Sequence, residues 1–595
     1  MSFTDHPAPA APAAKFRDAR YSPRRLEIEY RPGGEMVLTN PAPYDTRFMT
    51  MTAALAHWAS KTPSRVWLAE RSGGGWRTIT YGEAHEQINA IAGYLFAMGV
   101  VRAEPLLILA HNGIDHALIA YAAMSQRMPI APVSPQYGLK GSNPARLGRA
   151  LQVLKPACVY TDDAALFAEG LSAPGLSGLP VITSKNPGPR HIPFSQVLKG
   201  RPDVATDRPV DAAKYLLTSG STGHPKAVIC THANVCINSA QITACFHDPD
   251  PPVMVNSAPW SHSLGANSIL HNTAHRGGTL YIDHGAPVAG RFGETVQNLK
   301  EISPTYQNMV PAGWMLFVEE LEKDKALAKR FFERVRLLQY GGAALGQGFA
   351  DRIEAVALKT VGEKISFGSG YGATETGPTA TNVHWHNDRM GMIGLPLPGT
   401  SVRLVPQGEK LDFRVKGPQV TPGYLGQPEA SARAFDEEGF YMIGDAARFV
   451  DPADPAQGMV FDGRLSENFK LASGTFVGVG DIRIGAVTAI GGAVTDAIVC
   501  GEGREAVGLM FYPNPKMPRL EITVAVRNGV EAYNSRVRGA GARIARVLIL
   551  PDGPDAPSGE ITDKGYVAQA LARSRRGEAL VRLFSDPPPF DVMVF

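Results

Sequence analysis

Short apolar runs alternate with amphipathic stretches along most of this chain. The stretch 113–124 has the spacing of a helix, and Thr231 is placed to cap a second helix that runs to Ile242. Strands that alternate with helices predict an α/β architecture, in which loops at the strand ends commonly bind ligands. Five of the apolar runs have the length of buried strands: 106–109, 128–133, 215–217, 228–230 and 335–339.

The pattern changes after residues 463–467, where we place a domain boundary. Beyond it, three strand-like runs at 497–499, 507–512 and 547–550 precede a helical run over 566–584. This pattern predicts a small α+β domain behind a large multi-subdomain one, whose mixed sheets are packed by helices. The expected parts are a partly disordered N-terminal segment, the large domain and the small domain, at 1–45, 46–465 and 466–595.

Charge and composition limit the classes of partner. The 595 residues include 59 Lys and Arg against 56 Asp and Glu, so bulk charge favours neither nucleic acid nor a membrane surface. No apolar run approaches the roughly 20 residues of a spanning helix, and residues 1–14 resemble neither a signal peptide nor an anchor. The five cysteines lack paired metal-ligand spacing, which fits reduced thiols. We expect a cytoplasmic monomer or homodimer.

A loop of small residues carries the first chemical signal. Residues 218–226 read Thr-Ser-Gly-Ser-Thr-Gly-His-Pro-Lys. Glycines let the backbone bring its N–H groups close to an anion, and the hydroxyls and the lysine add donors, so the loop suits a polyphosphate. It is not the common nucleotide loop, because Pro225 precedes the lysine and Ala227 follows it. A solvated turn is the alternative. The predicted phosphate-binding residues are Thr218, Ser219, Gly220, Ser221, Thr222, Gly223 and Lys226.

Further short motifs follow the loop in a fixed order. They are Pro-Trp-Ser-His at 259–262, Gln-Tyr-Gly-Gly-Ala at 339–343, Tyr-Gly-Ala-Thr-Glu at 371–375, Tyr-Met-Ile-Gly-Asp at 441–445 and Gly-Arg at 463–464. Together they resemble the motifs of the adenylate-forming superfamily, which includes acyl-CoA synthetases, freestanding adenylation domains and luciferases. The resemblance covers approximately residues 50–585.

The resemblance implies two half-reactions at one site. A carboxylate attacks the α-phosphorus of ATP, giving an acyl-adenylate and pyrophosphate. The thiol of coenzyme A then attacks the mixed anhydride and releases AMP. Because the first step brings an anion toward a polyanion, cations and N–H donors must spread the charge. ATP, Mg²⁺ and coenzyme A are therefore expected, and the family implies a mobile C-terminal domain that rotates between the two steps.

Three residues carry the implied chemistry of the large domain. Glu375 would hold Mg²⁺, which prefers one or two carboxylates beside phosphate oxygens and water. Thr374 would donate to the α-phosphate. His262 occupies the position that gates the carboxylate entrance in the family. From the residues alone, His262 can also be a packed core histidine and Glu375 a solvated carboxylate.

Other motif residues would hold the nucleoside. Asp445 is the natural acceptor for the ribose hydroxyls, although it can also cap a turn, and Arg464 would steady the ribose-phosphate side. The residues implied to border the adenine are Gly341, Gly342, Ala343, Tyr371 and Gly372.

The small domain is expected to carry the adenylation lysine. Lys564 follows Lys516 as the last lysine of the chain, and a charge on a flexible stem can reach the carboxylate and the α-phosphate. The family's usual order is Gly-Lys, whereas here Lys precedes Gly, so a turn residue is the alternative. Among 465–467 we favour Ser466 as the hinge. The residues implied to border the coenzyme A channel are Lys470, Ser473 and Gly474.

The acid is the least determined part of the prediction. The segments 468–477, 479–483 and 561–565 are similar to feruloyl-CoA synthetases, bacterial ligases of hydroxycinnamates, although the similarity ends after Gly565. Glycines would leave a flat slot for a planar ring, with Asn267 and Thr379 meeting its hydroxyl or methoxy groups. The predicted pocket residues are His262, Ser263, Asn267, Gly342, Gly370, Gly377 and Thr379.

We therefore expect an ATP-dependent acid–CoA ligase of aromatic acid catabolism. Three alternatives stay open. The substrate can be another carboxylate, such as a benzoate, an arylalkanoate or a medium-chain fatty acid. The acceptor can be a carrier protein instead of free coenzyme A. The chain can also be a nucleotide-binding relative without turnover, although Lys226, Glu375, Asp445 and Lys564 argue against that class.

Overall fold

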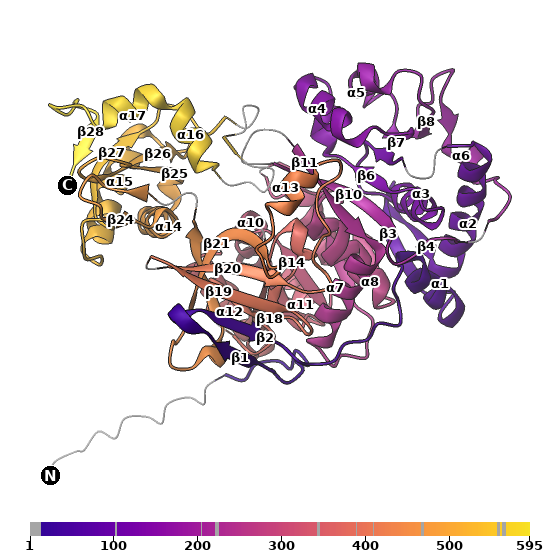
Figure 1. Cartoon of the computed structure of the whole chain (residues 1–595), viewed down its shortest axis with the longest axis horizontal. Helices are drawn as coiled ribbons and strands as arrows, with labels where there is room; N and C mark the ends of the chain where they lie inside the picture. The colour runs from indigo at the N-terminus through magenta and orange to yellow at the C-terminus, as the bar shows by residue number, and fades with distance from the viewer. Residues whose placement is uncertain are drawn as a thin grey trace, which may run out of the picture.

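The chain forms a large and a small α/β unit. The computed structural model describes residues 14–100, 104–203, 205–219, 225–288, 290–341, 345–387, 389–408, 410–465, 469–555, 560–561 and 567–595. Figure 1 shows the small unit, with β25 (Val494–Cys500) to β28 (Val592–Val594), beside the large one that ends with β22 (Met459–Arg464). Several sheets packed by helices confirm the predicted mixed α/β class.

A seven-stranded sheet contains the strands predicted from the first apolar runs. Its order is β11-β10-β6-β5-β7-β8-β9, with bounds Pro225–Thr231, Ala212–Ser219, Ile130–Pro132, Leu106–Ile108, Cys158–Asp163, Val181–Lys185 and Ile192–Pro193. The strand pairs from β10 to β9 are parallel, whereas β10 and β11 form an antiparallel hairpin. Thr231 caps α7 (His232–Ala244) as predicted, since its Oγ1 accepts from Asn234 N at 3.1 Å.

Helix α3 (Ile114–Ser125) lies between this sheet and a second one. All its residues except Asp115 are buried, because the helix is apolar on nearly every side. It contacts strands of both sheets and belongs to the largest apolar cluster, which also contains side chains of α1 (Met51–Lys61) and α2 (Tyr81–Ala97). The second sheet has the order β12-β13-β3-β4, with bounds Val253–Asn256, Thr279–Ile282, Val66–Ser72 and Gly75–Thr80.

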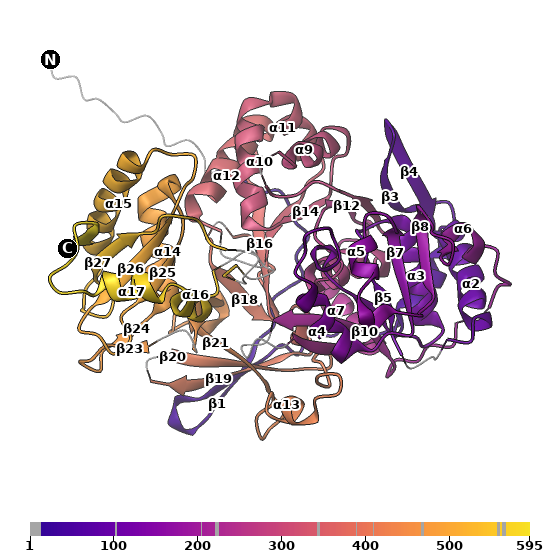
Figure 2. The same cartoon turned by 90° about the horizontal axis from the view of Figure 1, so that it is seen from above.

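An eleven-stranded sheet carries most of the predicted motifs. Its order is β1-β2-β19-β20-β21-β22-β18-β17-β16-β15-β14, with bounds Glu27–Tyr30, Met36–Thr39, Ser401–Gln407, Lys410–Lys416, Tyr441–Phe449, Met459–Arg464, Met392–Pro396, Thr381–Asn382, Ser366–Tyr371, Leu337–Tyr340 and Tyr306–Met309. Its β14–β16 end is parallel and is covered by four helices, visible in Figure 2: α9 (Phe292–Glu301), α10 (Pro311–Lys323), α11 (Lys325–Phe332) and α12 (Gln347–Val361).

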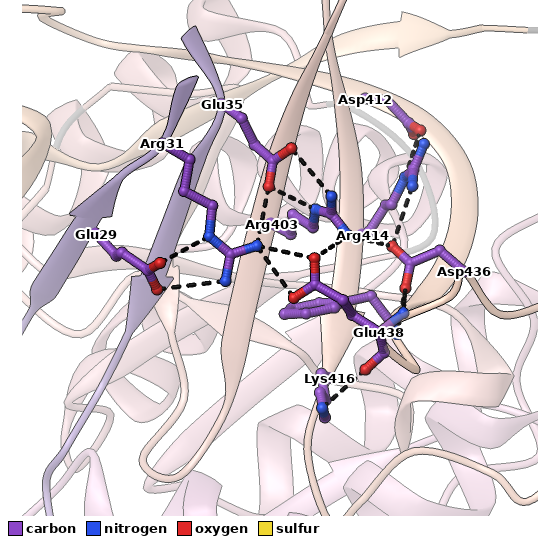
Figure 3. A network of polar contacts seen from close by, with 10 residues as sticks. Glu29, Arg31, Glu35, Arg403, Asp412, Arg414, Lys416, Asp436 and Glu438 are labelled. Atoms are coloured by element: carbon purple, nitrogen blue, oxygen red, sulfur yellow. Dashed lines mark hydrogen bonds and ion pairs between the residues drawn. The ribbon is translucent and has the colours of Figure 1, made fainter. Parts of the chain in front are cut away.

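Ion pairs hold the N-terminal hairpin β1–β2 on this sheet (Figure 3). Arg403 on β19 binds Glu35 through two hydrogen bonds of 2.7 and 3.0 Å. It also contacts Asp436 at 3.1 Å, and Asp436 accepts from Arg414 at 3.0 Å. These contacts join the β1–β2 connection to β19 and β20, and β20 is the strand next to β21.

The small unit is a four-stranded sheet with helices on both faces. Strands β25, β26 (Val507–Pro513) and β27 (Ile544–Ile549) include the three predicted runs. Helices α14 (Val479–Ile490) and α15 (Arg519–Asn534) pack on one face, and α16 (Gln569–Arg575) and α17 (Gly577–Leu583) pack on the other. A short hairpin, β23 (Phe469–Lys470) and β24 (Phe476–Val477), adjoins them.

The prediction of a single C-terminal helical run over 566–584 was wrong in one respect. The run is divided into α16 and α17 at Arg576, whose φ and ψ are −92° and 31°. The guanidinium of Arg576 donates to Glu560 at 2.9 Å and to Asp552 at 2.7 Å. These tertiary ion pairs are invisible in the local pattern, and they coincide with the break.

Candidate functional site

A cavity of about 140 Å³ lies against the β14–β16 end of the large sheet. One wall is the continuous helical segment of η4 (Leu264–His271) and α8 (Asn272–His275). Ser263, at the start of that segment, lines the cavity together with Gly370 and Thr379, as the sequence predicted for a substrate pocket. Gly341, Gly372 and Thr374 also line it, so predicted adenine, phosphate and acid residues share one space.

Two other predicted pocket residues, Asn267 and Gly377, contact each other and do not line the cavity. Asn267 is 3% exposed, and its Nδ2 donates to the carbonyl oxygen of Gly377 at 3.0 Å. Its Oδ1 accepts from Lys214 Nζ at 2.9 Å. Both ends of the Asn267 amide are therefore engaged with protein groups. His262 is partly buried next to Ser263, and Gly342 lies outside the described residues.

Lys214 is a site feature that the sequence analysis missed. Its side chain is fully buried in β10, four residues before Thr218, and burial lowers the pKa of its ammonium group to about 7. The available signal was a lysine within the apolar stretch 212–217. A charge inside a buried strand is unfavourable unless neighbouring groups hydrogen-bond to it or neutralise it. The position of this lysine therefore indicates polar surroundings within the buried strand.

The predicted magnesium and phosphate residues meet around Tyr424. Glu375 is 8% exposed, and its Oε1 accepts from the Tyr424 hydroxyl at 3.1 Å. Lys226 Nζ lies 4.7 Å from the centroid of the Tyr424 ring. Burial, followed by the nearby Glu375 carboxylate, raises the pKa of Tyr424, so the phenol stays a donor at neutral pH. No sequence motif indicated Tyr424.

Thr374 connects this group to the cavity. Its Oγ1 lies 3.1 Å from Ser263 Oγ, and either hydroxyl can donate. Thr374 and Glu375 begin the short turn η5 (Thr374–Thr376), so one residue lines the cavity while the next faces Tyr424. This turn therefore places a hydroxyl that lines the cavity next to a carboxylate that faces Tyr424.

The predicted ribose residues also come together. Tyr371 donates its hydroxyl to Asp445 Oδ2 at 2.5 Å, and Arg464 Nε lies 3.2 Å from Asp445 Oδ1. The antiparallel register of β21 and β22 pairs Asp445 with Arg464 directly. Asp445 is 6% exposed, so a largely buried carboxylate is fixed between a phenol and a guanidinium.

The phosphate loop is described only at its two ends. Thr218 and Lys226 face each other in the β10–β11 register, and Thr218 Oγ1 lies 3.5 Å from the carbonyl oxygen of Lys226. Ser219 ends β10. The other predicted loop residues, Gly220, Ser221, Thr222 and Gly223, lie outside the described residues. The predicted adenylation lysine Lys564, the predicted hinge Ser466 and the predicted adenine-side residues Gly342 and Ala343 also lie outside them.

The predicted coenzyme A residues lie apart from this group, on the small unit. Lys470 is in β23, and its carbonyl oxygen accepts from Gly503 N at 3.0 Å. Ser473 and Gly474 form the hairpin turn, where Gly474 has a φ of +81° and open space around its Cβ position. A larger side chain there would strain the backbone. The turn is thus tied to the small unit through residues 501–504.

Comparison with known proteins identifies the class. Residues 55–425 match the model of the AMP-binding enzyme family, and residues 485–581 match that of the AMP-binding enzyme C-terminal domain. Since the first match alone covers more than half of the chain, the protein belongs to the AMP-binding enzyme family.

Individual relatives indicate which class of AMP-binding enzyme the chain resembles. The chain is 24% identical to 4-coumarate–CoA ligase 5 of Oryza sativa subsp. japonica over 83% of this chain and 90% of the relative. It is 26% identical to feruloyl-CoA synthase of Amycolatopsis sp. over 64% of this chain and 72% of the relative. The family match and these ligase relatives indicate an AMP-forming acyl-CoA synthetase, as the motifs predicted.

Solved structures share the fold. ATP-bound MatB from Rhodopseudomonas palustris aligns with a TM-score of 0.69 at 19% identity, covering 89% of this chain and all of that one. O-succinylbenzoate coenzyme A synthetase from Bacillus subtilis, in complex with AMP, aligns with a TM-score of 0.67 at 17% identity, covering 87% and 97%. The predicted arrangement of a large N-terminal and a small C-terminal domain is that of adenylate-forming enzymes.

Proposed function

We propose that this enzyme joins an aromatic carboxylic acid of the hydroxycinnamate type to coenzyme A. It adenylates the acid with ATP, releases pyrophosphate, and then transfers the acyl group to the thiol with release of AMP. One observation carries the proposal: the η5 turn lines the cavity with Thr374 and presents Glu375 to Tyr424, beside Lys226. An acid in the cavity and a triphosphate along Lys226 would thus meet at this turn.

The roles follow from the charges that the first step must spread. Thr374 donates to the α-phosphate as the acid oxygen attacks, and Lys226 offsets charge on the departing pyrophosphate. Asp445, held by Tyr371 and Arg464, accepts from the ribose hydroxyls and sets the position of the α-phosphorus. Lys564 would reach the same phosphate from the small domain, and Ser466 would be the hinge that brings it there.

The residues present fit Mg²⁺. A single buried carboxylate beside phosphate-binding groups suits an ion that is commonly held by one or two carboxylates, phosphate oxygens and water. Among the residues that the structure describes, no group of three or more His, Cys, Asp or Glu side chains could form an all-protein metal cage. Glu375 is therefore the residue that would hold Mg²⁺, which when bound neutralises phosphate charge.

The acceptor and the acid class are supported by different observations. Coenzyme A is favoured because the chain resembles relatives that are named as CoA ligases over most of their length. The hydroxycinnamate class is supported by those same names and by glycines, Gly341, Gly370 and Gly372, that line the cavity.

In the described part of the chain no helix is long and apolar enough to span a membrane.

The test is AMP release with ATP, Mg²⁺ and coenzyme A against ferulate, 4-coumarate, caffeate, benzoate, phenylacetate and octanoate. The proposal expects hydroxycinnamates to give the highest kcat/KM, with AMP release dependent on coenzyme A. Preference for another acid would keep the ligase and remove the hydroxycinnamate assignment. Acyl-adenylate that accumulates unchanged with coenzyme A but transfers to a carrier protein would replace the acceptor.

A further inference from the structure

The end of the cavity opposite the η5 turn carries a charged side chain. We call this end, formed by Arg276 and Tyr306, the far end, whereas Asn382 lines the cavity opposite Gly370 in the strand register. Ser263 precedes the helical wall and Arg276 directly follows it, with η4 and α8 between them. At 1.5 Å per helical residue, their Cα atoms lie up to about 20 Å apart. A molecule whose carboxylate lies beside Thr374 therefore points its other end toward Arg276.

Two polar atoms of cavity-lining residues have no hydrogen-bond partner in the described part of the chain. Arg276 Nη2 and Asn382 Oδ1 are both buried and lack a hydrogen-bond partner within the described ranges. Asn382 as a residue is only 2% exposed. Leaving a buried donor or acceptor unpaired is unfavourable, and native proteins rarely do so without a reason. The guanidinium of Arg276 therefore has a donor that the described protein groups leave unused.

The charges around the far end leave Arg276 without a counterion. Its guanidinium carbon lies 5.1 Å from the centroid of the Tyr306 ring, and the Tyr306 hydroxyl donates to Asp248 at 2.5 Å. Asp248 is already bound by Arg20 and Arg336, each at 2.6 Å. Over the described part of the chain, Arg276 itself forms no ion pair with a carboxylate.

The acidic groups nearby do not balance the basic ones. Asp248 and Asp250 are shared by Arg20 and Arg336, which neutralise them. Arg276 therefore adds a positive charge that no neighbouring carboxylate offsets. Since a buried charge is stabilised by pairing and hydrogen bonding, the environment favours a ligand that brings an electron-rich oxygen to this point.

We infer that the far end binds an oxygen acceptor which the acid carries at the end opposite its reacting carboxylate. Arg276 donates to that oxygen. The oxygen is either a ring hydroxyl or a second carboxylate, both of which accept from a guanidinium. Arg276 is thus a specificity-determining residue. This inference rests on the proposed function, because it assumes that the cavity holds the acid.

The experiment compares acids that differ only at the far end. The panel is cinnamate, 4-methylcinnamate, 4-hydroxycinnamate and 4-carboxycinnamate, with hexanoate and adipate as a non-aromatic pair. Two quantities are measured for each: kcat/KM for pyrophosphate release, and the dissociation constant in calorimetry without ATP. Wild-type enzyme is compared with Arg276→Met, which keeps an unbranched stem on Tyr306, and with Arg276→Lys, which keeps the charge.

A matched control is an arginine that stacks on an aromatic ring away from the cavity. Arg24 lies 5.1 Å from the centroid of the Trp385 ring and donates to the carbonyl oxygen of Ala456 at 2.9 Å. Arg24→Met therefore removes a comparable arginine–aromatic contact without touching the far end. It should leave the ratio between oxygenated and unsubstituted acids unchanged.

The inference expects wild-type enzyme to prefer the oxygenated acids. Arg276→Met should lower kcat/KM and affinity for them about 10- to 100-fold, the range for a lost charge-assisted hydrogen bond. Values for 4-methylcinnamate should stay within threefold, and Arg276→Lys should restore part of the preference. A larger loss for 4-carboxycinnamate would identify a carboxylate as the favoured oxygen, and a larger loss for 4-hydroxycinnamate would identify a phenol.

The outcomes separate this inference from the proposed function. Turnover without an oxygen preference, or a preference unchanged in Arg276→Met, overturns the inference and leaves the ligase intact. Binding that depends on the oxygen and on Arg276, without turnover of any acid, supports the far end and overturns the ligase proposal. If no acid in the panel binds or reacts, both are overturned.

Discussion

The nucleotide side of the site and the far end of the cavity differ in how their charged groups are paired. On the nucleotide side, Asp445 is held by Tyr371 and Arg464, and Glu375 is held by Tyr424. At the far end, Arg276 forms no ion pair with a carboxylate in the described part of the chain, and its Nη2 is buried without a hydrogen-bond partner. The first region is arranged before any ligand arrives, which reduces the cost of binding, whereas the second depends on the ligand for its hydrogen bonds.

This difference has a functional consequence. Every acid uses the same nucleotide, so a rigid nucleotide side serves all turnovers. Selection among acids requires groups whose hydrogen bonds are formed only with the right partner, because unpaired buried groups penalise the wrong one. Variants of residues in and around these regions test this difference.

The largest effect is expected for Lys564→Ala. Removing this charge should lower the rate of adenylation by about 10²- to 10³-fold, because a donor to the transition state is lost. Thioester formation from supplied acyl-adenylate and coenzyme A should be retained. Both rates are measured separately in single turnovers. An equal loss in the two steps would show that Lys564 is not the adenylation lysine.

A smaller loss is expected for Glu375→Gln, together with a change in metal dependence. The neutral amide keeps the shape but removes the charge that would hold Mg²⁺, so the Mg²⁺ concentration for half-maximal adenylation should rise at least tenfold. Tyr424→Phe is the companion variant, since it removes only the donor to Glu375 and should raise that concentration about threefold to tenfold. Unchanged Mg²⁺ dependence in Glu375→Gln would remove its metal role.

Lys214 gives a prediction about pH and stability. The pKa of its ammonium is about 7 in the folded protein, against about 10.4 in an unfolded chain. Between these values the unfolded state binds one more proton, so this group makes the free energy of unfolding rise with pH, by about 1.4 kcal/mol per pH unit. Lys214→Met should lack this contribution.

The measurement for Lys214 is the urea midpoint of the large domain at pH 7, 8 and 9 in wild-type enzyme and in Lys214→Met. The difference between the two should change steadily over this range, with wild type gaining relative to the variant as pH rises. A constant difference would mean that Lys214 keeps an ordinary pKa. Below pH 7 both states are protonated, so the difference should become constant there.

The smallest effect is expected at the ion-pair network of Figure 3. Arg403→Met removes the bidentate contact with Glu35, whose side chain is 15% exposed, as is that of Arg403. The loss in stability should be about 1 kcal/mol, since the pair is partly shielded from water, with kcat unchanged. Denaturant unfolding of the purified variant measures the first quantity. A large fall in kcat would mean that the network also positions Asp445 on the neighbouring strand.

Much of the fold was predictable because it is encoded locally. The apolar runs at 106–109 and 128–133 became β5 and β6, and Thr231 caps α7 because a hydroxyl at that place pairs with the N–H three residues later. The single C-terminal helix was wrong, since Arg576 turns toward Glu560 through contacts that no local pattern contains. Burial of Lys214 was indicated only by its place within the apolar stretch 212–217, because it depends on what packs over β10.

The sequence by itself determined the family, since short motifs in a fixed order carry the chemistry of phosphate and carboxylate binding. It also indicated residues that line the cavity, such as Ser263, Gly370 and Thr379. Only the tertiary structure decided that Asn267 faces Lys214, that Tyr424 lies between Glu375 and Lys226, and that Arg276 and Asn382 share one cavity. The physical reason is distance along the chain. Tyr424 lies 49 residues from Glu375 and 198 residues from Lys226, and Arg276 lies 106 residues from Asn382. Folding alone brings them within reach of one another.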